Sequence, residues 1–145
     1  MWALTPTTTG PQACVGDTFH GLTVSDTVAA TQTRIQVSGD IFTPDWSGST
    51  QPGILMLEGP AGTLAGNAFS ATWSYCVLYA DSITLKADWT WTGTLSADQK
   101  SFTSTLRETL TEADGNQLFA CASISHPMSA CTAPGLSWQV DGVRQ

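Results

Sequence analysis

Hydrophobic and polar residues alternate one by one along residues 83–111, and this is the clearest pattern in the chain. A period of two is typical of an antiparallel strand with one face buried and the other in water. The pattern therefore predicts two strands joined by a turn that begins at Ser96. The positions expected on the buried face are Ile83, Leu85, Ala87, Trp89, Trp91, Gly93 and Leu95, and then Phe102, Leu106 and Leu110.

Glu108 breaks this alternation, because it is a charged residue on the apolar face. A turn that pairs Leu95 with Phe102 brings Glu108 opposite Trp89. A carboxyl group against an indole is partly withdrawn from water, and we expect this to raise its pKa. Such a group suits general acid catalysis or the anchoring of a ligand. The alternatives are that Glu108 lies in water at the mouth of the fold or pairs with a hydroxyl or backbone donor.

Shorter segments of the same kind follow one another along the rest of the chain, separated by turn residues such as Gly66-Asn67 and Asp114-Gly115-Asn116. No long amphipathic helix is visible. We therefore predict an all-β fold, a single antiparallel meander barrel, with a β-sandwich as the second choice. The further strands are expected at residues 19–25, 34–42, 54–58, 69–79, 118–125 and 136–140.

The first 16 residues differ from the rest, since they contain prolines, glycines and a run of threonines. This composition predicts an extended N-terminal tail over residues 1–16, followed by a single β-domain over residues 17–145. Such a tail could dock onto a partner or add a strand to a second copy of the chain, which would make a homo-oligomer.

A short internal repeat links two parts of the chain. Residues 62–73 read GTLAGNAFSATW, and residues 93–106 read GTLSADQKSFTSTL. Both contain Gly-Thr-Leu, a turn, a phenylalanine and then small polar residues. This hairpin style, over about the middle half of the chain, resembles that of lipocalin-like (calycin) barrels, including small bacterial members. The resemblance implies a β-barrel fold.

The amino-acid composition argues against some classes of function. Only 12% of the residues are charged, compared with about 25% in typical domains, and the formal net charge is −7. Acidity of this kind argues against a nucleic-acid partner, which needs clustered basic residues. No apolar run approaches the ~20 residues of a membrane span. No sequence motif predicts a cofactor or a metal site.

Four cysteines are present, and none forms a Cys-x-x-Cys pair. An even number in a chain of this composition predicts two disulfides, with Cys121–Cys131 and Cys14–Cys76 as the favoured pairing among three possibilities. Disulfides imply a secreted or periplasmic protein. The alternative is a set of four reduced, buried thiols.

Three tryptophans, Trp73, Trp89 and Trp91, fall on predicted apolar faces. In a barrel they would line the lumen, where indoles bind flat apolar molecules or sugars. The alternative is that they only fill the core. Trp46 and Trp138 are less easily assigned to the core, and are candidate anchors for a protein or glycan partner.

Three functions remain open. The first is an extracellular β-barrel that binds a small apolar or carbohydrate ligand through Trp73, Trp89, Trp91 and Glu108. The second is a disulfide-stapled structural or inhibitory domain that docks through its N-terminal tail. The third is an enzyme that uses Glu108 as a general acid or base in an apolar pocket.

Overall fold

The computed structural model describes residues 1–9, 18–19, 22–23, 32–38, 41–45, 54–79, 83–114 and 136–145. These residues form β-strands and turns with no helix, so the prediction of an all-β fold is confirmed for this part of the chain. It therefore contains no helix that is able to cross a membrane. The strands are β1 (Trp2–Thr8), β2 (Thr18–Phe19), β3 (Leu22–Thr23), β4 (Gln32–Ser38), β5 (Ile41–Asp45), β6 (Ile54–Ala65), β7 (Ala68–Tyr79), β8 (Ile83–Leu95), β9 (Ser101–Asp114) and β10 (Leu136–Arg144).

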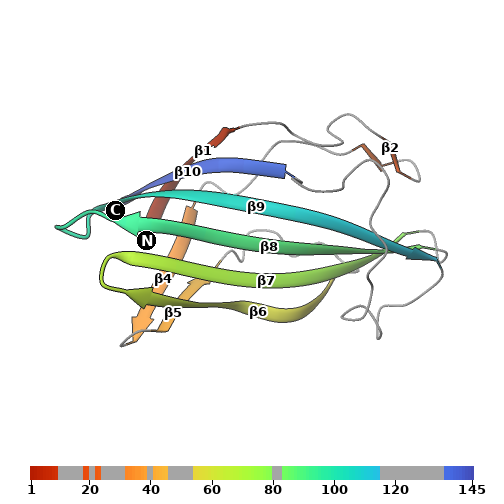
Figure 1. Ribbon diagram of the computed structural model, residues 1–145, viewed down its shortest axis with the longest axis horizontal. Helices are drawn as coiled ribbons and strands as arrows, with labels where there is room; N and C mark the ends of the chain where they lie inside the picture. Colours follow the sequence, from red (N-terminus) through yellow and green to blue (C-terminus); the bar gives the residue numbers. More distant parts are fainter. Residues whose placement is uncertain are drawn as a thin grey trace.

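Six strands form one continuous antiparallel sheet in the order β1-β10-β9-β8-β7-β6. Figure 1 shows the long strands β6 to β10 running side by side. The edges of these six strands, β1 and β6, do not pair with each other. Instead β5 pairs with β6 over two residues, β4 pairs with β5, and β4 pairs with β1 over two residues.

The β8–β9 hairpin has the register that the alternation predicts. Leu95 pairs with Phe102, and Trp89 pairs with Glu108. One face of this hairpin is accordingly buried, whereas its threonines lie on the other face. Register matters because a shift of one residue would move every side chain to the opposite face of the sheet.

Part of the core lies where β8 turns into β9, and we call this end of the sheet the turn end. Four aromatic residues, which we call the turn-end cluster, pack here: Trp2, Phe69, Trp91 and Phe102. Their ring centroids lie 5.0 to 5.6 Å apart in edge-on or tilted contacts. These arrangements are favourable because the positive edge of one ring meets the negative face of another.

Two glycines make room for these rings. A Cβ atom on Gly93 would lie 2.5 Å from the Phe69 ring, and a Cβ atom on Gly142 would collide with the Phe102 ring. A residue with any side chain at either position would therefore displace an aromatic ring of the cluster.

The internal repeat corresponds to two hairpins that turn at the same end. Leu64 pairs with Phe69 in one hairpin as Leu95 pairs with Phe102 in the other. The two turns are joined by a hydrogen bond in which the Leu95 backbone N–H donates to the Asn67 carbonyl, 2.8 Å apart. Gly66 has a φ of 61°, as a two-residue hairpin turn with glycine first requires.

The N-terminal segment differs from the expected tail, because Trp2–Thr8 forms β1 inside the sheet. β1 pairs with β10 along its whole length, and Trp2 and Leu4 are buried. The Gln145 N–H also donates to the Met1 carbonyl at 3.0 Å. The order of this segment thus needs no second chain. The sequence alone did not predict this strand, because its two buried side chains, Trp2 and Leu4, are followed only by Thr and Pro.

Other strands begin or end at residues different from those expected from the sequence. The single strand expected at residues 34–42 is two strands, β4 and β5, which pair as a hairpin. β6 continues to Ala65 through Gly59 and Pro60, and its register against β7 shifts on both sides of Glu58. Such bulges allow a strand to pass through residues that usually end one. The strand expected at residues 118–125 lies outside the described part of the chain, as does Trp46.

Side chains hold the turn between β8 and β9 together. The Ser96 hydroxyl donates to Asp98 Oδ1 at 2.7 Å, and the Lys100 backbone N–H donates to the same oxygen at 3.1 Å. These hydrogen bonds stabilise the ionised carboxylate and hold the pKa of Asp98 below its usual value.

Candidate functional site

The buried face of the sheet, which we call the inner face, carries three indoles that stack on one another. The opposite face, which carries the threonines, is called the outer face. Trp73 on β7 and Trp89 on β8 are nearly parallel, with an interplanar angle of 2° and centroids 5.9 Å apart. Trp138 on β10 continues the series, at 16° and 5.7 Å from Trp89. We call these three residues the tryptophan stack. Trp73 and Trp138 are buried, whereas Trp89 between them is half-buried.

Strand pairing explains how the tryptophan stack forms. Trp73 and Trp89 are direct cross-strand partners on β7 and β8. Trp138 lies two strands from Trp89, with β9 between them, and its own register partner on β9 is Leu106. The sequence left Trp138 less easily assigned to the core and made it a candidate anchor for a partner. Its alternation with Leu136 and Val140, both buried, is the sequence signal that places it on the inner face.

Glu108 lies beside the tryptophan stack, as the register predicted. It pairs with Trp89 on one side and with Leu136 on the other, and only 8% of its surface is exposed. Ser104 and Glu108 are buried polar residues of the sheet, and Glu108 is the one of the two with an ionisable side chain. A carboxylate has several lone pairs, so a carboxyl group beside the indoles can accept a hydrogen bond from a ligand in addition to any bond within the protein.

Trp91 lies apart from Trp73, Trp89 and Glu108, although it had been grouped with them. It belongs to the turn-end cluster and has no exposed surface. Its Nε1–H donates to the Ser104 hydroxyl at 2.8 Å, and that hydroxyl in turn donates to the Val140 carbonyl. Every polar atom in this chain of bonds is used within the core, so this arrangement suits a structural role.

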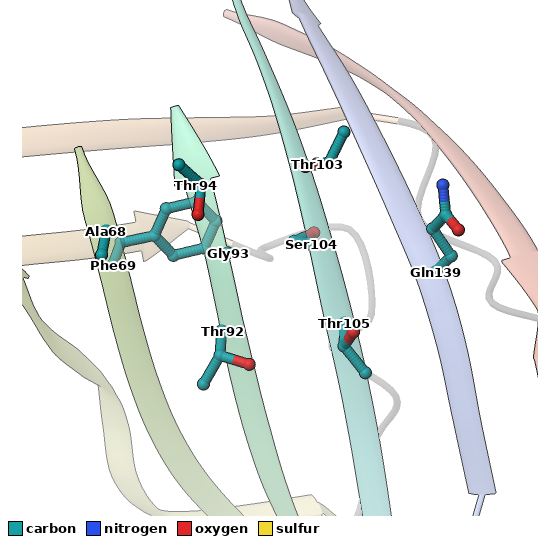
Figure 2. Close-up of a pocket in the computed structure, with 9 residues that line it drawn as sticks. All are labelled: Ala68, Phe69, Thr92, Gly93, Thr94, Thr103, Ser104, Thr105 and Gln139. Carbon is teal, nitrogen blue, oxygen red and sulfur yellow. The ribbon is translucent and has the colours of Figure 1, made fainter. Parts of the chain in front are cut away.

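The outer face of the sheet carries hydroxyl groups. Figure 2 shows Thr92 and Thr94 on β8 opposite Thr103 and Thr105 on β9, with Gln139 on β10 beside them. They line an open hollow of about 510 Å³ that has no charged residue in its wall.

Three charged residues of the outer face, Lys86, Asp88 and Arg107, lie further from the turn end along β8 and β9. Asp88 forms an ion pair with Lys86 at 3.0 Å and accepts a hydrogen bond from Ser74. Arg107 pairs in register with Thr90. Ion pairs near the protein surface contribute about 0–1 kcal/mol to stability.

A second hollow, of about 320 Å³, opens at the turn end. It is lined by Met1, Trp2, Ile35, Leu64, Leu95, Gln99 and Arg144. The described residues include no group of three or more histidine, cysteine or acidic side chains that would hold a metal ion.

Comparison with known proteins gives no significant match, whether with protein-family models, with curated proteins or with solved structures. The resemblance to calycin barrels therefore stays an expectation.

The structural role of Trp91 can be tested by removing its hydrogen bond. Ser104→Ala leaves the buried indole N–H without its acceptor, and we expect it to lower the free energy of unfolding by about 1–3 kcal/mol in chemical denaturation. Trp91→Phe should also be destabilising. The double variant should lose less than the sum of the two single losses, because both remove the same bond.

Thr105→Ala is the matched control, because Thr105 follows Ser104 but lies on the outer face. This change should alter stability by no more than about 0.5 kcal/mol. Equal stability of Ser104→Ala and the wild type would show that the bond from Trp91 to Ser104 contributes nothing.

Proposed function

We propose that the protein binds a small apolar ligand through the tryptophan stack, with Glu108 as the polar anchor. The observation that carries this proposal is the position of Trp89, a half-buried indole between two parallel indoles and directly opposite a buried carboxyl group. Small-molecule sites typically combine apolar and aromatic walls with very few polar groups that fix the orientation of the ligand.

The chemistry of the two faces favours an apolar ligand over a carbohydrate. A sugar is usually held by an aromatic ring together with many hydrogen-bonding groups. Here the indoles lie on the inner face, whereas the threonine hydroxyls and Gln139 lie on the outer face of the same strands. A flat apolar molecule with one N–H or O–H donor matches the inner face better, since Glu108 supplies one acceptor.

We also propose that the sheet closes into an antiparallel barrel, whose lumen is the inner face described above. Support comes from the short pairings at the sides of the six-stranded sheet. Trp2 and Ala3 pair with β4, and Ile41 and Phe42 pair with β6. Closure removes exposed strand edges, which otherwise promote aggregation.

Two other functions are weaker alternatives. The docking of an N-terminal tail onto a partner loses support, because β1 is already paired within its own sheet. An enzyme that uses Glu108 as a general acid or base would need a second reacting group near it. Ligand binding needs only the groups already described.

A secreted or periplasmic location with two disulfides remains part of this proposal. Cys76 is completely buried on β7, while Cys14, Cys121 and Cys131 lie outside the described residues. Mass spectrometry of non-reduced peptides should link Cys121 to Cys131 and Cys14 to Cys76. Four alkylatable thiols in the native protein would contradict both the disulfides and the location inferred from them.

The ligand site can be tested with N-phenyl-1-naphthylamine, a neutral aromatic probe with one N–H donor. Titration should give saturable energy transfer from tryptophan to the probe. Glu108→Gln should weaken binding about fivefold, since hydrogen bonds to charged groups are stronger by roughly 1 kcal/mol than those to neutral groups. Trp89→Phe should weaken it several-fold through lost ring contact.

Arg107→Gln is the control, because Arg107 is adjacent in sequence but lies exposed on the outer face. It should bind the probe as the wild type does. If Glu108→Gln binds the probe normally and instead loses about 1–3 kcal/mol of stability, then Glu108 is a structural residue and the proposed site is wrong.

A further inference from the structure

The hollow at the turn end is a separate site from the tryptophan stack. Along the inner face, the wall residue Leu95 belongs to the row of Phe102 and Gly142, and Trp2 and Arg144 lie one row beyond it. Trp89 and Glu108 lie three rows from Leu95 in the other direction along β8 and β9. The two intervening rows are filled by Phe69, which packs against Gly93, and by the fully buried Trp91. A molecule in this hollow therefore cannot reach the tryptophan stack through the core.

Apolar side chains form the walls of the hollow. Trp2 and Leu95 are buried there, and the partly buried Ile35 and Leu64 pack against the same core. The Trp2 ring contacts Phe102 at 5.2 Å between centroids, so this wall of the hollow is part of the turn-end cluster. Its volume of about 320 Å³ falls at the lower end of the ~300–1,000 Å³ that small-molecule sites span.

Arg144 is the one charged side chain in the wall. It continues the inner-face alternation of Trp138, Val140 and Gly142 along β10, and it pairs in register with Trp2. The salt bridge found in the described part of the chain joins Lys86 to Asp88, so Arg144 has no carboxylate partner among those residues. A guanidinium group binds a carboxylate through two parallel hydrogen bonds.

The charges near the hollow favour an anion, although the chain as a whole carries a formal charge of −7. Lys100 lies next to Arg144, because the Arg144 backbone N–H donates to the Lys100 carbonyl at 2.9 Å. The acidic residue of this turn, Asp98, directs its Oδ1 to the Ser96 hydroxyl and the Lys100 N–H. Two of the five basic residues of the chain are thus gathered at this end.

We propose that this hollow binds a monocarboxylate with a short apolar tail. Arg144 holds the carboxylate at the mouth, and Trp2, Ile35, Leu64 and Leu95 enclose the tail. This site is independent of the proposed ligand site at the tryptophan stack, and either can exist without the other.

Octanoate is a suitable probe, compared with 1-octanol, which has the same tail and no charge, and with acetate, which has the charge and almost no tail. Binding can be followed by the chemical shift of the Trp2 indole N–H, assigned with Trp2→Phe. Octanoate should bind more tightly than either of the other two compounds. Arg144→Gln should weaken octanoate binding about tenfold or more and leave 1-octanol binding unchanged.

Two further variants complete the test. Arg107→Gln makes the same charge change on the outer face and should bind octanoate as the wild type does. Leu64→Trp fills the hollow and should abolish binding of both long-chain probes, while circular dichroism confirms that the variant is folded. The proposal is overturned if Arg144→Gln binds octanoate normally, if octanoate shifts no Trp2 signal, or if octanoate and octanol bind alike. Since N-phenyl-1-naphthylamine reports on the other site, its binding distinguishes failure here from failure there.

Discussion

The register of the β8–β9 hairpin is the constraint on which the rest of the structure depends. The pairing of Leu95 with Phe102 fixes every other pair of the hairpin, including Trp89 with Glu108. A slip of one residue would bring Thr90, Thr92 and Thr94 into the core and expose the tryptophans. Burying their hydroxyls without partners would be costly. The alternation therefore selects one register, and that register sets the composition of both faces.

Inside the sheet, this register divides the aromatic residues into two groups with different properties. The turn-end cluster is closed: Trp91 is fully buried, its N–H is bonded to Ser104, and glycines admit the neighbouring rings. The tryptophan stack is more open, because Trp89 keeps part of its surface exposed and has a carboxyl group as its neighbour. Binding sites commonly lie on a well-packed support, as the tryptophan stack and Glu108 lie beside the turn-end cluster.

The sequence was sufficient to predict the structure where hydrophobic and polar residues alternate regularly. The alternation over residues 83–111 predicted both strands, their pairing and the position of Glu108 beside Trp89. It was insufficient where contacts over a long sequence distance decide the structure. β1 forms because β10 offers it a partner, which two apolar residues among prolines and threonines do not reveal. Likewise, periodicity places Trp89 and Trp91 on the same face of the sheet. It cannot show that Trp89 stacks beside Glu108 whereas Trp91 packs against Phe69 and Phe102.

The most direct test of the account is to ask which tryptophan meets a ligand. Fluorine NMR of the protein labelled with 5-fluorotryptophan gives a signal for each indole, and single substitutions assign these signals. During titration with N-phenyl-1-naphthylamine, the signals of the tryptophan stack should move, with the Trp89 signal moving furthest, while the Trp91 signal should stay in place. Saturation of the protein with no change at Trp89, or with an equal change at Trp91, would contradict the division between a binding face and a closed core.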